Sequence, residues 1–308
     1  MRLLHNSAKA QFTQSVIKTV VARYKSVKSN GHDWSLVKFS GNDYDLVWNR
    51  DYSLVGHQFS VGVSSGRIKV NFAKKPLSQF QKAKAKFGSA KVLNKFGKWF
   101  LHIPMSKEVP ALTIDEVSNV VGVDLGIKCP AVSYCPDGSV KFYGNGRKNK
   151  YIRRHYNNLR KRFQKAKKPK AVVKINNKEQ RIMKDIDHKL SREIVNTAKA
   201  HDVSVIKLER LQNIRSTTRT SRKNNHSLHT WSFYRLATFI EYKAKLAGIE
   251  VEYVDPAYTS QICPICGSVH HANDRNYTCR CGFHTHRDLL GAINICNSTE
   301  YIGNRYTA

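Results

Sequence analysis

Acidic residues are scarce in this chain. Its 308 residues include 22 Asp and Glu against 53 Lys and Arg, which gives a formal net charge of +31. This excess exceeds what solubility requires and favours a polyanionic partner, most simply nucleic acid. A ribosomal or chromatin-like packing protein would carry the same charge, so charge alone does not choose between a binding protein and an enzyme.

Long apolar runs are missing as well. No segment approaches the roughly 20 apolar residues that span a bilayer, and the first residues have no long apolar core of the kind found in signal peptides. The cysteines do not indicate a disulfide framework, because Cys129, Cys135 and Cys296 are scattered and the other four are clustered. We therefore expect no membrane partner and a location in a reducing cytoplasm.

The clustered cysteines form two close pairs, which are Cys263 with Cys266 and Cys279 with Cys281. Two tight turns that each carry a pair of thiolates are typical of a tetrahedral Zn²⁺ site, and Gly267 and Gly282 suit such turns. The second pair has the tighter C-x-C spacing, so His284 or His286 is an alternative ligand. Free buried cysteines are the plain alternative to a metal site.

The N-terminal third reads as one helix followed by strands. Apolar residues four apart predict an amphipathic helix over residues 10–28, ending near Asn30 and Gly31. Alternating apolar residues then predict two β-hairpins, over 57–72 and 90–103, and a short basic helix is expected near Leu77–Phe87. A plain β-barrel with solvated lysines and a nucleic-acid platform explain this part equally well.

Single acidic residues interrupt two otherwise apolar strands. Asp124 lies in NVVGVDLGI, and Glu209 lies near the end of VSVIKLERL. A buried carboxylate costs several kcal/mol unless it is paired or bound to a metal. The first of these strands is followed by a hairpin with a Pro136-Asp137-Gly138 turn, and an RNase H-like nuclease core begins in this way. A core Asp satisfied by a hydroxyl group is the plain alternative.

Residues 147–184 are strongly basic, with 16 Lys and Arg and one acid, Glu179. An aromatic stripe predicts a helix that breaks at Lys168-Pro169, and a second helix is predicted to run to about Ala200. Such a run would follow the phosphates of a nucleic acid, with salt-dependent affinity. The candidate nucleic-acid-binding residues of this run and of the following basic loop are Arg147, Lys148, Lys150, Arg153, Arg154, Arg160, Lys161, Arg162, Lys165, Lys167, Lys168, Arg219, Arg222 and Lys223.

A third acid, Asp288, stands at the start of a helix directly after the cysteines. If the strands of Asp124 and Glu209 are neighbours and this helix packs against them, three carboxylates converge. Oxygen ligands of this kind suit Mg²⁺, with Mn²⁺ as a possible substitute. Two such ions roughly 3.5–4 Å apart would support phosphodiester hydrolysis.

Several ordered motifs together resemble one known family. They are VGVDLGI, IKLERL, the helix W-S-F-x-x-L-x-x-F-I-E-Y-K-A, V-D-P-x-Y-T-S-Q-x-C-x-x-C-G and R-D-x-x-x-A-I-N-I. In this combination the chain resembles the transposon-encoded TnpB family of RNA-guided nucleases, relatives of the type V CRISPR effectors, over about residues 50–296.

The resemblance implies an α/β plus β fold. In that fold an RNase H-like (RuvC) nuclease core with an inserted zinc ribbon follows an oligonucleotide-binding-type β-barrel, the wedge domain. The implied domains are a helical recognition segment at 1–32, the wedge-like barrel at 33–117, the RuvC-like core at 118–258 with a basic helical insertion at 147–200, a zinc-ribbon target-nucleic-acid-binding module at 259–285, and the final RuvC helix and tail at 286–308.

The resemblance also implies functional roles. By matching position, the catalytic, Mg²⁺-binding acids are Asp124, Glu209 and Asp288, and the ligands of one structural Zn²⁺ are Cys263, Cys266, Cys279 and Cys281. The implied partners are a guide RNA from the transposon end and a double-stranded DNA target. Base pairing in such systems reads the sequence, while the protein reads duplex shape and a short flanking motif.

The chain departs from the family's pattern in three places. It enters at a single helix, where the family begins with a barrel strand and a longer helical recognition lobe, and this leaves room for a homodimer. Leu290 and Gly291 follow Asp288 where the pattern is D-x-N-A-A, and the second cysteine pair is C-x-C.

The sequence therefore predicts an Mg²⁺-dependent, RNA-guided DNA endonuclease of a mobile element. One alternative is an RNA-guided DNA-binding protein without cleavage, either repressor-like or a truncated relic, which the three intact acids disfavour. The other is an auxiliary transposase, for which the sequence offers no nucleophilic Tyr or Ser context.

Overall fold

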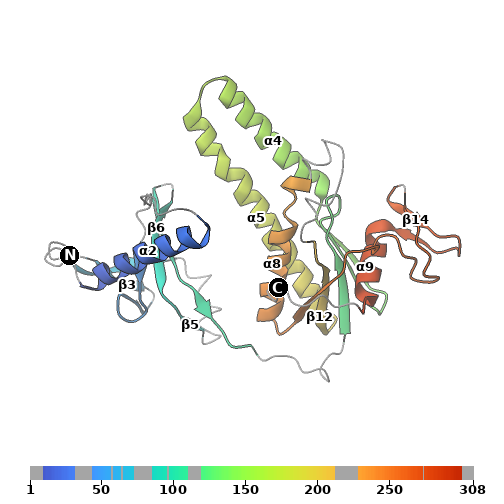
Figure 1. Cartoon of the computed structure of the whole chain (residues 1–308), viewed down its shortest axis with the longest axis horizontal. Coiled ribbons are helices and arrows are strands. Elements are labelled where there is room, and N and C mark those ends of the chain that lie inside the picture. Colours follow the sequence, from blue (N-terminus) through green and yellow to red (C-terminus); the bar gives the residue numbers. More distant parts are fainter. Residues whose placement is uncertain are drawn as a thin grey trace. The chain divides into compact units, whose positions relative to one another are not determined.

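A computed structural model of the chain describes residues 10–31, 44–56, 58–63, 65–72, 85–95, 97–109, 119–211, 228–272 and 274–299 (Figure 1). The chain divides into two compact units, Met1–Glu108 and Val109–Ala308, each with a hydrophobic core of its own. Among the residues so described, no helix combines the length and the apolar character that crossing a membrane requires.

The first unit consists of a helix and short strands. Helix α2 (Ala10–Ser29) ends just before Asn30 and Gly31, as predicted, and Gly31 adopts a φ of +74°. The strands pair into three small antiparallel sheets, with the orders β1-β6-β7, β2-β3-β4 and β5-β8. Their bounds are Tyr44–Leu46 (β1), Tyr52–Val55 (β2), Gln58–Val63 (β3), Gly66–Asn71 (β4), Lys86–Phe87 (β5), Ala90–Lys95 (β6), Lys98–His102 (β7) and Met105–Ser106 (β8).

Both predicted hairpins are confirmed, as β3–β4 and β6–β7. The prediction of a basic helix near Leu77–Phe87 is wrong at its end, because Lys86–Phe87 form β5 and pair with β8. Phe87 stacks on the ring of Trp48 with 4.4 Å between ring centroids, so packing at this position outweighs local helix propensity. The rest of that expected helix, residues 77–84, lies outside the described residues.

A five-stranded mixed sheet organises the second unit, in the order β11-β10-β9-β12-β13. Strands β9, β10 and β11 are antiparallel neighbours, whereas β12 runs parallel to both β9 and β13. The parallel strands β9 and β12 are rich in buried valine and isoleucine, as expected for strands covered on both faces. The bounds are Asn119–Asp124 (β9), Ala131–Tyr134 (β10), Val140–Tyr143 (β11), Val203–Glu209 (β12) and Glu250–Val254 (β13).

Helices cover the two faces of this sheet (Figure 1). Helices α5 (Pro169–Ala200) and α8 (Phe233–Leu246) share one core with Val121 and Val123 of β9. Helix α9 (Arg287–Asn297) packs on the opposite face, against the intervening residue Gly122. Side chains alternate between faces along a strand, so one strand faces both layers.

The helical hairpin of the second unit matches the sequence-based expectation, and a small β-hairpin that was not expected precedes α9. Helix α4 (Gly146–Lys165) and α5 form a long helical hairpin that breaks before Pro169, which occupies the first turn of α5. A two-stranded hairpin, β14 (Asn276–Thr278) with β15 (His284–His286), leads directly into α9. The loops before and within that hairpin carry the four clustered cysteines.

Candidate active site

Asp124 and Glu209 end two neighbouring parallel strands, β9 and β12. The register pairs Val123 with Leu208, so the next residue on each strand, which is the acid, stands at the same carboxyl edge of the sheet. Asp288 lies in the first turn of α9 and is buried, with 7% of its surface exposed. The structure therefore brings together the three acids that the sequence singled out.

Helix α9 reaches this edge because two glycines allow close approach. A Cβ atom at Gly122 would lie 2.2 Å from the Ala292 carbonyl oxygen and 2.5 Å from the Cys296 nitrogen, so any side chain there would displace the helix. A Cβ atom at Gly291 would lie 3.2 Å from Cγ of Asp124. Gly291, one of the departures from the D-x-N-A-A pattern, is thus the point where α9 contacts the Asp124 carboxyl group.

The carboxyl groups perturb one another. Burial raises the pKa of Asp124 well above its usual value, and the charges of Glu209 and Asp288 raise it further. Burial also raises the pKa of Glu209 to about 7, while the hydrogen bond from Thr259 opposes this rise. Protonation of the acids or binding of a cation would each reduce the electrostatic repulsion between the carboxylates.

Arg275, from the loop before β14, is an ion-pair partner of Asp288. One guanidinium nitrogen of Arg275 contacts Oδ1 of Asp288, and the Arg287 backbone N–H donates to the Arg275 carbonyl at 2.7 Å. The other oxygen, Asp288 Oδ2, is buried and has no hydrogen-bond partner within the described part of the chain. Sequence reasoning did not find this pairing, because 13 residues and a loop of unknown shape separate the two side chains.

A second network holds Glu209. The Thr259 hydroxyl donates a hydrogen bond to Glu209 Oε1. The loop that carries Thr259 is fixed in turn by Asn294 of α9, whose side-chain amide donates to the carbonyl oxygens of Thr259 at 2.7 Å and Ile262 at 2.8 Å. Asn294 therefore links the helix of Asp288 to Thr259, which donates the hydrogen bond to Glu209. The sequence showed both residues inside motifs but gave no geometry that would connect them.

The donor set fits a hard divalent cation. Three carboxylates, raised pKa values and a buried carboxylate oxygen without a partner all call for positive charge at this edge. Among the described residues, two groups have all their ligand atoms within 4.8 Å of one another, and the three acids are not one of them. One ion in contact with all three would require closer carboxylates, whereas a pair of ions tolerates the wider spacing.

The four cysteines form one of these compact groups. The Cys263 and Cys281 sulfurs lie 3.6 Å apart, and those of Cys266 and Cys279 lie 3.4 Å apart, without a disulfide. Zn–S bonds of about 2.3 Å in a tetrahedron place neighbouring sulfurs about 3.8 Å apart, so the geometry suits Zn²⁺. The other compact group is Cys135, Asp137 and His201.

Tight turns hold the cysteines as the spacing predicts. Gly267 donates to the Cys263 carbonyl and Gly282 to the Cys279 carbonyl, and both glycines have positive φ, +71° and +93°. His284 and His286 do not belong to the four-sulfur group. Instead, Nδ1 of His286 accepts the Asp288 backbone N–H at 3.2 Å and caps α9.

Leu290 packs against the cysteine module and belongs to the helix that carries Asp288. Leu290 is fully buried in a small core with Cys263, Tyr277 and Cys279, and it stands two residues after Asp288 in α9. Leu290, the other departure from the D-x-N-A-A pattern, therefore connects the cysteine module to the helix that carries the third acid.

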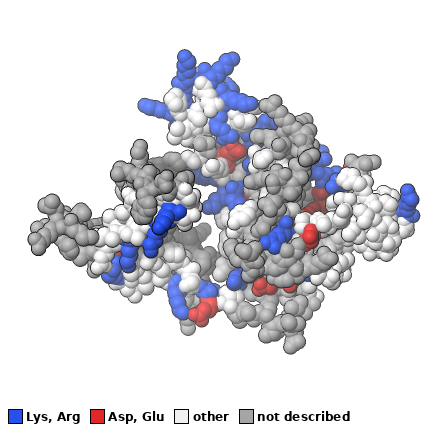
Figure 2. All heavy atoms as spheres, viewed as in Figure 1, with Lys and Arg blue, Asp and Glu red and all other residues white. Residues whose placement is uncertain are grey.

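The predicted basic residues of the first run line the α4–α5 hairpin, over which Lys and Arg gather in Figure 2. Most are exposed; Arg160 instead pairs with Glu179 of α5 at 2.7 Å and ties the two helices together. Arg219, Arg222 and Lys223 lie outside the described residues.

Comparison with known proteins shows which proteins this chain resembles. A family model described as the Cas12f1-like TNB domain matches residues 233–295. A TnpB-like protein of Methanocaldococcus jannaschii is 34% identical over 165 residues, which cover 51% of this chain and 59% of that protein. The chain is thus similar to TnpB-like and Cas12f proteins over part of its length.

Cas12f proteins are also similar to this chain. The CRISPR-associated endodeoxyribonuclease Cas12f1 of Sulfoacidibacillus thermotolerans is 28% identical over 216 residues, covering 64% of this chain and 50% of that protein. A solved Cas12f1–sgRNA–target DNA complex matches 94% of this chain and 71% of its own, with a TM-score of 0.67 and 16% identity, which shows a common fold. The chain spans about half the length of the curated relatives it matches.

Proposed function

We propose that this chain belongs to the TnpB family and acts in RNA-guided DNA cleavage, hydrolysing phosphodiester bonds of a target at the site of Asp124, Glu209 and Asp288. The observation that carries the proposal is the convergence of these acids from β9, β12 and α9 at one edge of the sheet. The relative named a CRISPR-associated endodeoxyribonuclease and the Cas12f1 structure solved with sgRNA and target DNA support the same chemistry.

The strand order supports an RNase H-like (RuvC) core. Three antiparallel strands followed by two parallel ones, with an acid at the end of the first and of the fourth, agree with that architecture. In the same proposal, the cysteine module is the zinc ribbon and the strands of the first unit form the wedge domain. The domain boundaries expected from the sequence belong to this proposal as well.

Asp124, Glu209 and Asp288 would hold Mg²⁺ or Mn²⁺. When bound, a pair of such ions supplies an activated water and stabilises the oxygen that leaves phosphorus. The chain itself supplies the positioning: Thr259 orients the Glu209 carboxylate, and Arg275 holds Oδ1 of Asp288, whose buried Oδ2 has no hydrogen-bond partner among the described residues. The reaction consumes one water, breaks one P–O bond and leaves a phosphate on one end and a hydroxyl on the other.

The zinc ion has a structural role in this proposal. Cys263, Cys266, Cys279 and Cys281 provide four thiolates and leave no open coordination position for a substrate. Zinc would stabilise the small core that includes Leu290 and so the start of α9.

The partners in this proposal are a guide RNA and double-stranded DNA. The exposed Lys and Arg of the α4–α5 hairpin provide a surface for phosphates. Such contacts position a strand but do not read its sequence, and this division agrees with recognition through base pairing.

Binding without cleavage is the alternative, and the contact between Arg275 and Asp288 favours it. An arginine on Asp288 Oδ1 competes with a cation for that oxygen, and the three acids are more widely spaced than a closed metal site. Such a protein would occupy its target and produce no nicked DNA at any Mg²⁺ concentration.

The guide is tested by co-expressing the protein with the DNA downstream of its gene and sequencing the RNA that co-purifies. We expect a structured RNA that ends in variable sequence. Plasmids with a matching target and with a scrambled target are then incubated with the complex and Mg²⁺, and we expect the matching plasmid alone to be cut. Equal cutting of both plasmids, or RNA no different from that in a mock purification, would overturn RNA guidance.

A further inference from the structure

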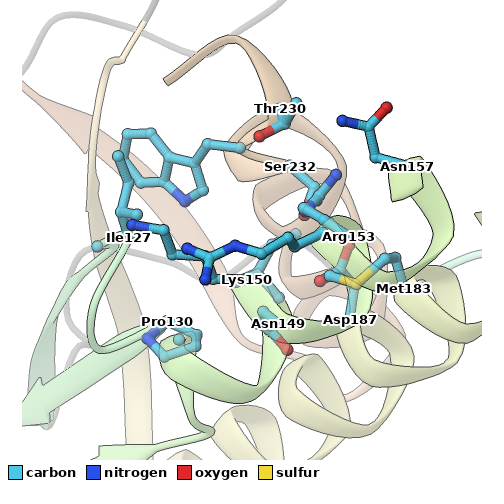
Figure 3. A pocket seen from close by; sticks show the side chains of 15 residues that line it. Ile127, Pro130, Asn149, Lys150, Arg153, Asn157, Met183, Asp187, Thr230 and Ser232 are labelled. Atoms are coloured by element: carbon cyan, nitrogen blue, oxygen red, sulfur yellow. The ribbon is translucent and has the colours of Figure 1, made fainter. Parts of the chain in front are cut away.

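A pocket of about 300 Å³ opens two residues beyond Asp124. It begins at Gly126 and Ile127 in the loop after β9 and continues along the first turns of α4. Its other walls come from Met183 and Asp187 of α5 and from residues 230–236 at the start of α8. Elements distant in the sequence thus enclose one space, whose labelled side chains point toward one another in Figure 3.

Positive charge is concentrated in this pocket. Lys150, Arg153 and Arg154 all line it, and Figure 3 shows Lys150 and Arg153 extending side by side across it. Arg153 is half-buried and makes no hydrogen bond or ion pair with any residue that the structure describes; burial lowers the pKa of its guanidinium group. A guanidinium group with five unused donors in a desolvated position calls for an anion.

The acid in the pocket wall does not meet this need. Asp187 is 2% exposed, and Arg235 binds its Oδ2 atom through Nε at 2.7 Å and through a terminal nitrogen at 2.6 Å. Asp187 and Glu179 act on Arg153 through their charges, but neither makes an ion pair or a hydrogen bond with it within the described part of the chain, so its donors can bind a ligand from outside the protein.

The remaining lining is largely apolar. Ile127, Pro130, Met183 and Leu236 line the space together with the indole of Trp231. A phosphate group alone would not need these apolar walls, and an apolar ligand alone would not need three cations. A nucleotide combines a flat, largely apolar base with an anionic phosphate, and so it matches both parts of the lining.

We propose that this pocket receives one unstacked nucleotide of a nucleic-acid strand lying along α4. Its base packs against Trp231 and Ile127, and its phosphate binds Lys150 and Arg153. The pocket lining begins at Gly126, two residues after Asp124 in the chain. This inference rests on the nucleic-acid-binding part of the proposed function and is independent of whether the acids cleave DNA.

The test measures binding of the full chain in buffer free of Mg²⁺ and Mn²⁺ and without a chelator, so that it is separate from cleavage and the proposed zinc ion stays bound. The probes are fluorescein-labelled thymidine strands of about 12 nucleotides and abasic strands with the same number of phosphates, in DNA and in RNA form. We expect Trp231→Ala to reduce the preference for the base-bearing strand by about tenfold and Trp231→Phe to retain most of it. Whether the DNA or the RNA pair shows the effect identifies the source of the nucleotide.

Two matched pairs of variants complete the test. Ile127 is 40% exposed, so Ile127→Asn leaves the fold intact and should also weaken the preference for bases, unlike Val140→Asn at the similarly exposed Val140 on β11. Arg153→Gln should weaken binding of both strands more than Arg162→Gln, which makes the same change on α4 outside the pocket. An unchanged preference in both Trp231→Ala and Ile127→Asn, or equal effects of the two arginine variants, would overturn the proposal.

Discussion

Two opposing effects set the pKa of the Glu209 carboxyl group. It is placed at the end of a buried strand, where burial raises its pKa to about 7, and one hydroxyl group, that of Thr259, favours its charged form. Near neutral pH the carboxyl group can therefore either hold a proton or bind a cation. The raised pKa follows from the burial of Glu209 in the folded chain and does not require a bound partner.

The first prediction concerns pH and Glu209. Its folded pKa, about 7, is above the ordinary value of 4.5, so the folded state holds this proton more tightly than the unfolded state. In EDTA, the resulting contribution to the free energy of unfolding is fully present below pH 4.5 and is lost as pH rises to about 7. Urea unfolding across this range should show a steeper decline for the wild type than for Glu209→Gln.

Magnesium provides the control for this pH effect. Adding Mg²⁺ at pH 8 should stabilise the wild type and leave Glu209→Gln nearly unchanged, because the carboxylate is then a ligand. Parallel pH profiles for the two proteins in EDTA would contradict the account.

The second prediction concerns Thr259. Thr259→Val removes the hydrogen bond to Glu209 and leaves a carboxylate oxygen without its donor, a loss of about 1–3 kcal/mol for the charged form. We expect the Mg²⁺ concentration for half-maximal cleavage to rise at least about fivefold. Thr238→Val, on the exposed side of α8, is the matched control and should behave as the wild type. The same Mg²⁺ dependence in both variants would exclude a positioning role for Thr259.

Among the elements, α9 depends on close contact with β9. The third prediction is that Gly122→Ala forces these elements apart, because the new Cβ would meet the backbone of Ala292 and Cys296, which cannot rotate away. We expect a loss of about 1–3 kcal/mol in the free energy of unfolding and a larger relative loss of cleavage, since Asp288 moves with the helix. Gly138→Ala is the comparison, because a Cβ at that turn meets no atom within 4 Å and only the strain of its +87° φ is added. Equal cleavage rates for Gly122→Ala and Gly138→Ala would refute this arrangement.

The fourth prediction concerns the cysteine module. Cys266→Ser should reduce bound zinc, measured by atomic emission, from about one ion per chain to well below one, because the site loses a thiolate. Leu290 shares a core with Cys263 and Cys279, so we expect cleavage to fall together with zinc content. Cys129→Ser, far from the four-sulfur group in sequence and outside it in space, should retain its zinc. Full cleavage by a zinc-free Cys266→Ser protein would show that the module does not support α9.

The elements also show what the sequence alone could predict. The strands of Asp124 and Glu209, the break before Pro169 and the turns at Gly267 and Gly282 are encoded locally, by apolar runs, a missing N–H group and positive φ. The contacts of Arg275 with Asp288 and of Thr259 with Glu209 depend on how α9 meets the sheet, so no local pattern contains them. The prediction of a helix near Leu77–Phe87 is wrong at its end for the same reason, because the ring of Phe87 packs on Trp48, a residue distant in the sequence.

In the second unit, the basic surface and the candidate catalytic acids lie on different elements. The acids lie at one edge of the sheet, while the basic residues of the α4–α5 hairpin form an extended surface of the same unit (Figure 2). With a net charge of +31, the chain attracts phosphates over a wide area, and the acidic edge needs a cation before a phosphate can approach it. Binding of nucleic acid and cleavage should therefore be separable by single substitutions.

The most direct test of this account compares cleavage by three proteins loaded with the co-purified RNA: the wild type, Asp124→Ala and Asp185→Ala, the last removing an exposed acid of α5. The rate of cutting of a matched DNA target in Mg²⁺ is measured together with RNA and target binding. We predict that Asp124→Ala lowers the rate at least about 1,000-fold with unchanged binding, while Asp185→Ala stays within about twofold of the wild type. Cleavage by Asp124→Ala at the rate of Asp185→Ala would contradict the central claim that the three acids form the cleavage site.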